Sequence, residues 1–110
     1  MAQQGRTGEH EVYVEAVLSL VEGVPVGRAT TYGVLAGAVG HGGPRQVGRV
    51  MAVYGSSVPW WRVVRADGSL PLSHQCEALV HYREEGTPLR GRITDAASLR
   101  VDLDAVLWMP

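Results

Sequence analysis

Apolar side chains recur at helical spacing near the start of the chain. They lie three or four residues apart, which is the spacing of one helix face, and comprise Val14, Val17, Leu18 and Val21. This pattern predicts a helix over residues 9–22 that ends at Gly23. Residues 1–8 carry no such pattern, so we expect them to form a flexible leader.

Two shorter helical patterns follow, separated by a glycine-rich turn. The first begins at Thr30, a good N-cap, and ends at Gly40; its apolar positions are Val34, Leu35, Ala38 and Val39. The second begins at Pro44, which suits the first helical position. Its apolar positions Val47, Val50 and Met51 should face inward, with Arg45 and Arg49 on the opposite face. Two short helices joined by a tight turn are typical of a helix-turn-helix.

The second half of the chain predicts a hairpin and another helix. The segment "WWRVVRADGSL" alternates like a strand, turns at Asp67-Gly68 and returns. A hairpin in this position would be the wing of a winged-helix domain. Residues 73–85 predict a helix that is capped by Gly86 and has a mixed face of Cys76, Leu79, Val80 and either Tyr82 or Arg83. The apolar end "VLWMP" should dock on the core. We therefore expect a mainly α fold with a small β-hairpin, as one winged-helix-like DNA-binding domain over residues 9–110.

Composition excludes several classes of protein. No apolar run approaches the roughly 20 residues of a membrane-spanning helix, and the first residues do not resemble a secretory signal. A single cysteine, Cys76, cannot form an internal disulfide, and no Cys/His pair has the spacing of zinc ligands. We expect a cytoplasmic monomer without metal, cofactor or membrane partner.

Charge is unevenly distributed along the chain. The net charge is −1, yet residues 23–66 contain no Asp or Glu. This stretch holds five arginines: Arg28, Arg45, Arg49, Arg62 and Arg65. The basic half of the molecule could therefore face the phosphates of a nucleic acid.

Three separated segments of the sequence are informative when they are considered together. The blocks "GRATTYGVLAGAVG", "PRQVGRVMA" and "VPWWRVVRADG" resemble the DNA-binding and active-site segment of the O6-alkylguanine-DNA alkyltransferases, and the resemblance spans about residues 12–92. The enzymes of that family carry Pro-Cys-His-Arg-Val, whose cysteine accepts the alkyl group. Here the same positions read Pro59-Trp60-Trp61-Arg62-Val63. Tryptophan in the cysteine position marks the alkyltransferase-like proteins, whose usual core is Pro-Trp-His-Arg-Val, so Trp61 departs from both patterns.

The residues themselves argue against alkyl transfer. An alkyl acceptor must be a thiolate activated by a nearby base. The indole of Trp60 is no such nucleophile, and Trp61 occupies the place of the base. We expect Cys76 to be a buried small hydrophobe, as most lone cysteines are. The chain is therefore predicted not to be an enzyme.

The resemblance implies a function in recognising damaged DNA. Proteins of this kind bind O6-alkylguanine in duplex DNA through the minor groove and flip the nucleotide into a pocket. The site would then pass to nucleotide excision repair proteins. The resemblance gives Tyr32 the position that crowds the 3′ phosphate, and Arg45 that of a finger filling the vacated stack. We expect Thr31 and Gln46 to contact DNA beside them, and Arg49 to be either a phosphate contact or a plain surface charge.

The pocket is expected beside Trp60, open toward the face that bears Tyr32 and Arg45. By resemblance, the Trp60 carbonyl and the Val63 amide read the guanine edge. Trp61 belongs to the predicted lesion pocket, where we favour a packing role in the space of the histidine over direct contact with the lesion. Ser73, His74 or Gln75 could supply polar groups to the lid. We expect Arg62 to pair with a carboxylate or carbonyls behind the pocket, and Glu85, in the place of the enzymes' relay glutamate, to be structural or exposed.

Other functions remain open from the sequence. A winged-helix transcription regulator would read bases with Gln46 and Arg49, but no dimerisation helix is evident. An active alkyltransferase would have to use Cys76. A residual DNA-binding scaffold without lesion specificity would leave Tyr32 as a half-buried core residue and Arg45 as a solvated surface residue.

Overall fold

The computed structural model describes residues 2–69, 74–92 and 98–110, with side-chain exposure from Gly8 onward. The elements are α1 (Ala2–Gly23), β1 (Thr30–Thr31), α2 (Tyr32–Val39), α3 (Pro44–Tyr54), the 3-10 helices η1 (Gly55–Ser57) and η2 (Trp60–Arg62), β2 (Val63–Val64), α4 (Gln75–Glu85), β3 (Leu89–Arg90), β4 (Arg100–Val101) and α5 (Leu103–Val106). The mainly helical composition expected from the sequence is confirmed.

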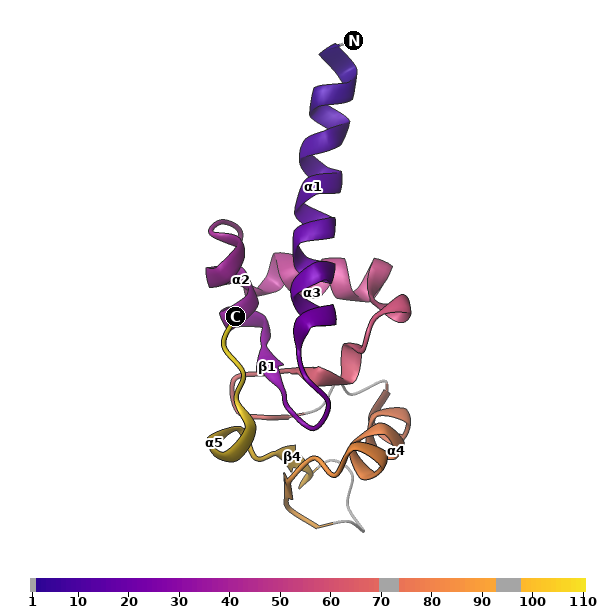
Figure 1. Cartoon of the computed structure of the whole chain (residues 1–110), viewed down its shortest axis with the longest axis vertical. Coiled ribbons are helices and arrows are strands. Elements are labelled where there is room, and N and C mark those ends of the chain that lie inside the picture. The colour runs from indigo at the N-terminus through magenta and orange to yellow at the C-terminus, as the bar shows by residue number, and fades with distance from the viewer. Residues whose placement is uncertain (1, 70–73, 93–97) are drawn as a thin grey trace.

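The long helix α1 gives the molecule its elongated shape. It runs along the longest axis, and its N-terminal end projects beyond the other elements (Figure 1). The molecule measures 55 × 24 × 21 Å along its principal axes. Within the described part of the chain, no helix combines the length and apolar character needed to cross a membrane.

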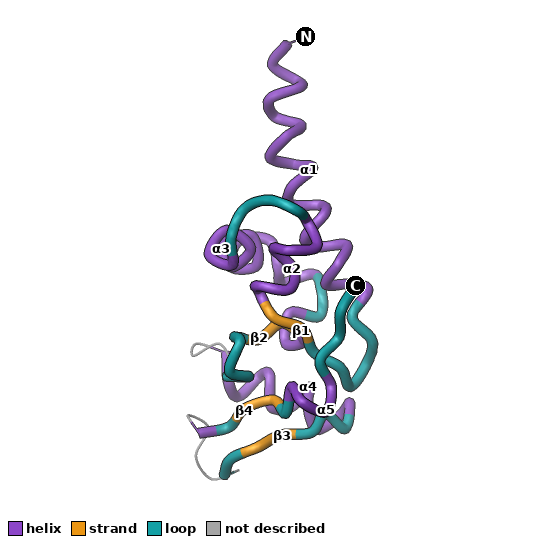
Figure 2. Tube along the Cα trace, turned by 90° about the vertical axis from the view of Figure 1, so that its left-hand side faces the viewer, coloured by secondary structure: helices purple, strands orange, loops and turns teal. Residues whose placement is uncertain are grey.

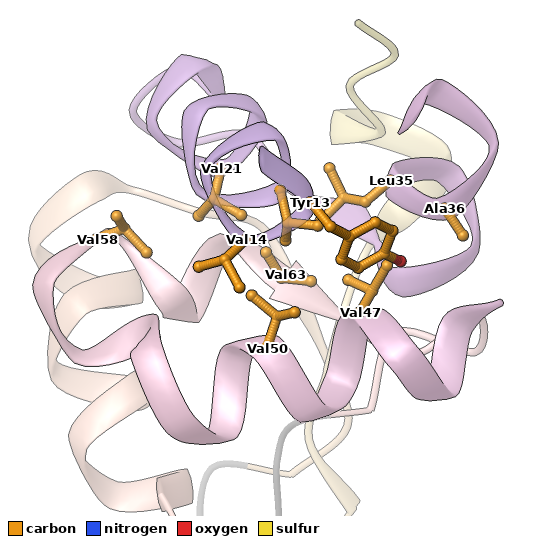
Figure 3. Close-up of a cluster of buried hydrophobic side chains, with 10 residues drawn as sticks. Tyr13, Val14, Val21, Leu35, Ala36, Val47, Val50, Val58 and Val63 are labelled. Atoms are coloured by element: carbon orange, nitrogen blue, oxygen red, sulfur yellow. The ribbon is translucent and has the colours of Figure 1, made fainter. Parts of the chain in front are cut away.

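A first hydrophobic cluster joins α1, α2 and α3. Figure 3 shows apolar side chains from these helices converging between them. The buried members are Tyr13, Val14, Val17, Val21, Leu35, Ala36, Val47, Val50, Val58 and Val63. The helical spacing of α1 and α3 therefore predicts correctly which of their faces is buried.

A second cluster lies under α4 and the C-terminal segments. Its buried members are Ala29, Val64, Ala78, Tyr82, Leu99, Val101 and Val106. The two clusters meet at β2, which pairs in parallel with β1 through Thr30↔Val63 and Thr31↔Val64 (Figure 2). Because neighbouring strand residues point to opposite faces, Val63 enters the first cluster and Val64 the second. This two-residue strand joins the two halves of the core.

The first two helices begin at other residues than predicted. Helix α1 begins at Ala2 rather than near Glu9. Once a helix has nucleated, it extends at one hydrogen bond per residue, and no proline interrupts residues 2–8. The N-cap of α2 is Thr31, whose Oγ1 accepts from the Val34 amide at 3.1 Å. Thr30 instead pairs with β2.

The prediction of a strand that starts at Trp60 is wrong for its first three residues. Trp60–Arg62 form the 3-10 helix η2, and only Val63–Val64 are a strand. A turn does follow, closed by the Gly68 amide donating to the Arg65 carbonyl at 2.8 Å. Beyond it, Ser69 bridges to Arg100, and residues 70–73 lie outside the described residues. Among the strands that the structure describes, the antiparallel pair is β3–β4.

The inward face of α4 agrees with the prediction at Tyr82 and differs from it at Cys76 and Val80. Ala78 and Tyr82, one turn apart, are buried, whereas Val80 is 55% exposed. Cys76 is exposed as well, which corrects the expectation of a core cysteine. Because positions 76 and 80 each lie two residues from Ala78, about 200° around the helix, they point away from the core.

The C-terminal segment docks on the core, as expected. The Ala29 amide donates to the Val106 carbonyl at 3.2 Å, and the Trp108 amide donates to the Ala29 carbonyl at 2.8 Å. The Arg28 guanidinium donates to the Val106 and Leu107 carbonyls at 3.0 and 2.8 Å. This arginine of the basic stretch therefore serves the fold.

The turn after β2 generates a prediction about stability. Gly68 has a φ of +82°, and a Cβ there would overlap the Val101 carbonyl. We expect Gly68→Ala to lower the free energy of unfolding by about 3 kcal/mol, measured by urea denaturation. Gly86 is the control, since its φ is +70° but no atom lies near its Cβ position. Gly86→Ala should cost only about 1 kcal/mol; equal losses would contradict a steric role for Gly68.

Candidate nucleic-acid interface

A cavity of about 360 Å³ opens beside Trp60, between α3 and the start of α4. Its volume lies in the range of about 300–1,000 Å³ that is typical of small-molecule sites. The residues that line it are Tyr32, Gly48, Met51, Ala52, Gly55, Ser56, Trp60, His74 and Glu77. The expected cavity beside Trp60 and Tyr32 is therefore present.

Small residues on α3 create the space. Gly48 and Ala52, one turn apart, and Gly55 just after the helix present almost no side chain to the cavity. The opposite face of α3 carries Val47 and Val50, which are buried in the first cluster. Helix α3 thus packs on one side and leaves a hollow on the other.

Trp60 is a partly buried wall of this cavity. Three rings surround it: Trp61 with centroids at 5.6 Å, His74 at 5.5 Å and His81 at 6.0 Å. Trp61 and His81 meet it edge-on, at interplanar angles of 86° and 84°, an arrangement that aromatic pairs favour. The indole is therefore held in place while part of its surface faces the cavity.

Trp61 does not line the cavity. Its ring stacks on His81, with centroids 3.5 Å apart and planes within 4°. Its indole Nε1 donates to Glu85 Oε2 at 2.8 Å. This placement agrees with the expectation that Trp61 packs behind the pocket, and it separates the two adjacent tryptophans into one wall residue and one supporting residue.

Glu85 is the centre of the supporting network. Its carboxylate forms a bidentate pair with Arg62, at 3.1 Å from Nε and 2.7 Å from Nη2, and accepts from the Gly27 amide at 3.1 Å. The Arg62 Nη1 donates to the Val24 carbonyl at 3.0 Å. Arg62 therefore pairs with a carboxylate and a carbonyl, as expected, and Glu85 is structural.

The network also sets the charge state of Glu85. The Arg62 and Glu85 side chains are only 13% and 10% exposed. Burial alone would raise the pKa of the Glu85 carboxyl, but hydrogen bonds from Arg62, Gly27 and Trp61 outweigh it and hold that pKa below the usual 4.5. The carboxylate is thus ionised and fully engaged.

Some main-chain groups of residues 60–63 are already hydrogen-bonded within the protein. The Val63 amide donates to the Trp60 carbonyl, and Val63 is fully buried. A backbone amide has a single donor, so in this structure the Val63 amide has none left for a base. The Trp60 carbonyl keeps a second lone pair, while the Tyr82 hydroxyl donates to the carbonyl of Trp61.

Tyr32 and Thr31 begin α2 at the edge of the site. Tyr32 lines the cavity, and burial raises the pKa of its phenol, an effect that Arg65 partly offsets. Thr31 is only 8% exposed and its hydroxyl caps α2. The structure thus gives the Thr31 side chain a structural use, whereas Tyr32 is open to a ligand.

The exposed face of α3 carries the DNA-contact candidates. Arg45, Gln46 and Arg49 are all exposed. By helical spacing, Arg45 and Arg49 share a face with the cavity residues Gly48 and Ala52. A ligand lying along this face could contact the arginines and reach the cavity together.

Only part of the basic stretch is free to bind phosphates. Arg28 and Arg62 are used within the fold. Arg45, Arg49 and Arg65 form no hydrogen bond or ion pair through their side chains with the described residues. Arg65 was not among the predicted contacts, although its place in the acid-free stretch was a usable signal.

Several residues that line the cavity were not predicted from the sequence. Gly48, Met51, Gly55, Ser56 and Glu77 line the space but were not selected. The helical repeat of small residues on α3 was a signal for the first of these; nothing in the sequence indicated that Glu77, on another helix, would face them. The candidate Ser73 lies outside the described residues.

Comparisons with known proteins point in one direction. Residues 13–84 match the family model of the 6-O-methylguanine DNA methyltransferase, DNA binding domain. The structure is similar to that of Atl1 from S. pombe in complex with damaged DNA containing O6-carboxymethylguanine, with a TM-score of 0.77 and 25% identity over 91% of this chain and 97% of that one. It is also similar to S. pombe ATL in complex with DNA, with a TM-score of 0.75 and 27% identity over 92% and 97% of the two chains. No curated protein matches the chain by sequence. The winged-helix-like fold class is confirmed.

The ionised Glu85 predicts a loss of stability in acid. A folded-state pKa below the unfolded value stabilises the protein above pH 4.5, and this contribution disappears as the pH falls through the folded pKa. We expect Glu85→Gln to lower the free energy of unfolding at neutral pH by about 2–4 kcal/mol, since it leaves Arg62 unpaired.

The free energies of unfolding of wild type and Glu85→Gln are measured by urea denaturation at neutral pH and at about pH 3. The difference between the two free energies should be smaller at the lower pH. Glu84→Gln is the control, because Glu84 is an exposed neighbour and its removal should change neither value appreciably. A Glu85→Gln deficit that is independent of pH would contradict a role for the ionised carboxylate.

Proposed function

Because the chain belongs to the family of the 6-O-methylguanine DNA methyltransferase DNA-binding domain, we propose that it binds duplex DNA and recognises O6-alkylguanine without removing the alkyl group. The similarity to S. pombe Atl1 bound to damaged DNA supports lesion recognition. The observation that carries the proposal is the cavity beside Trp60 on the arginine-bearing side of α3.

The chemistry of the cavity wall does not favour alkyl transfer. Transfer needs a thiolate within reach of the adduct and a base to activate it. The cavity presents the indole of Trp60, and Trp61 behind it is committed to Glu85. Cys76 is the sole cysteine; it is exposed on α4 and is not among the residues that line the cavity. A lesion in this cavity would be held, not repaired.

Access to the lesion would require nucleotide flipping. Extruding a base from the duplex costs a few kcal/mol, which contacts made after extrusion must offset. We propose that α3 enters the minor groove and that Tyr32, at the cavity edge, crowds the backbone of the flipped nucleotide. Arg45 would fill the vacated stack, because its planar guanidinium stacks on bases and donates to the orphaned partner.

Stacking of the base on Trp60 and the shape of the cavity would contribute more to recognition than hydrogen bonds between the main chain and the edge of the base. The Val63 amide is engaged with the Trp60 carbonyl, so the carbonyl is the group left to accept from a guanine. The flat surface of Trp60 and the adaptable Met51 side chain would pack against base and adduct.

A bound but unrepaired lesion must pass to other proteins. We propose that the complex marks the site in the cytoplasm for nucleotide excision repair, and that the chain acts as a monomer. The bent duplex, with a nucleotide held outside the stack, would be the signal that these proteins recognise.

Filling the cavity provides the test of lesion recognition. We expect wild type to bind a duplex containing O6-methylguanine roughly tenfold to a hundredfold more tightly than the same duplex with guanine, measured by gel shift at moderate salt. Gly48→Leu should abolish this preference and leave binding to unmodified DNA. No atom lies within 4 Å of the Cβ position of Gly48, and leucine raises helix propensity, so the variant should fold.

Gly37→Leu is the matched control, since Gly37 is a helical glycine with equally open surroundings and does not line the cavity. It should keep the wild-type preference. Equal binding of wild type to the two duplexes would remove the proposed function, and an unchanged preference in Gly48→Leu would remove the cavity as the lesion site.

The two α3 arginines should differ in their effects. As the residue that fills the stack, Arg45 should contribute mainly to lesion binding, so Arg45→Ala should reduce the preference for O6-methylguanine about tenfold. Arg49→Ala should weaken binding to both duplexes alike and lower the slope of log affinity against log salt by about 1. Gel shifts over a salt series measure both. If Arg45→Ala weakened binding to both duplexes to the same extent, as expected for Arg49→Ala, Arg45 would be another phosphate contact.

A further inference from the structure

The cavity wall contains one side chain whose charge the lesion-binding proposal does not use. Glu77 lies in the first turn of α4 and lines the cavity together with Trp60 and His74. It is exposed, and its carboxylate makes no hydrogen bond or ion pair with the described residues. The carboxylate is therefore available to whatever enters the cavity.

The described part of the wall has no Lys or Arg side chain to balance this charge. Among the described residues that line the cavity, Glu77 is the only acid, and none is Lys or Arg. Arg62 pairs with Glu85 on the other side of η2. Arg65 interacts electrostatically with the Tyr32 phenol at the cavity edge, but it is not among the residues that line the cavity. The remaining polar groups of the wall are the Tyr32 phenol, the Ser56 hydroxyl and the His74 imidazole.

Resting on the proposed function, we propose that Glu77 determines which class of O6 adduct the cavity accepts. Neutral alkyl adducts and adducts that carry a hydrogen-bond donor or a positive charge would be bound, such as hydroxyalkyl or aminoalkyl groups. Adducts that carry a carboxylate would be rejected.

The magnitudes favour repulsion over attraction at this wall. The N-terminus of α4 is equivalent to about half a positive charge, which would attract an anion if it were unoccupied. Glu77 already supplies a full negative charge to that first turn. Like charges brought together in a partly enclosed site lose affinity steeply, and none of the described wall residues is a Lys or Arg that could offset the contact.

The experiment compares duplexes that differ only in the adduct. O6-Methylguanine is the neutral probe and O6-carboxymethylguanine the anionic one; unmodified guanine is the reference. We expect full-length wild type to bind the carboxymethyl duplex about tenfold more weakly than the methyl duplex, by competition gel shift. Glu77→Gln keeps the shape of the side chain and removes its charge, so it should bring the two affinities within about twofold of each other.

Glu84→Gln is the matched control. It removes the same charge from an exposed position of the same helix, two turns or about 10 Å further along, and it should keep the wild-type ratio. Equal affinities for the two adducts in wild type, or a ratio that Glu77→Gln leaves unchanged, would overturn the role of Glu77 while lesion recognition stands. Binding of neither adduct above unmodified guanine would overturn lesion recognition itself, and this inference with it.

Discussion

The ion pair between Arg62 and Glu85 holds η2, which carries Trp60, against the end of α4. Glu85 ends α4, Arg62 ends η2, and the two are joined by two hydrogen bonds. The same carboxylate accepts from the Gly27 amide, and the same guanidinium donates to the Val24 carbonyl. The pair therefore ties α4 and η2 to the segment that leaves α1. Because both side chains are largely buried, losing either partner would leave an uncompensated charge.

The pair explains why two tryptophans stand side by side. A 3-10 turn directs successive side chains about a third of a turn apart, so Trp60 and Trp61 leave η2 in different directions. Trp61 turns toward Glu85 and His81 and becomes part of the support. Trp60 remains at the cavity, with the edge of Trp61 against it. The second indole thus holds the first in place.

Gly48 leaves room for the cavity, although glycine lowers the helix propensity of α3. Glycine at position 48 costs about 1 kcal/mol relative to alanine, and nothing in the local packing requires it, since a Cβ would meet no atom. The hollow next to Trp60 is a physical reason to keep it. The same side of α3 bears Arg45 and Arg49, whereas Glu77 gives the cavity wall the opposite sign. Attraction for the DNA backbone and selection among adducts would then rest on separate residues.

The sequence by itself determined where α1 to α4 lie, apart from the start of α1, and which faces of α1 and α3 are buried, because helical periodicity is a local property. The tertiary structure decided the rest. It placed Cys76 outside the core and turned Trp60–Arg62 into a 3-10 helix. It also brought Glu77 to the cavity and Glu85 to Arg62. These outcomes depend on how α4 packs across η2, a contact between segments distant in the chain that no local pattern specifies.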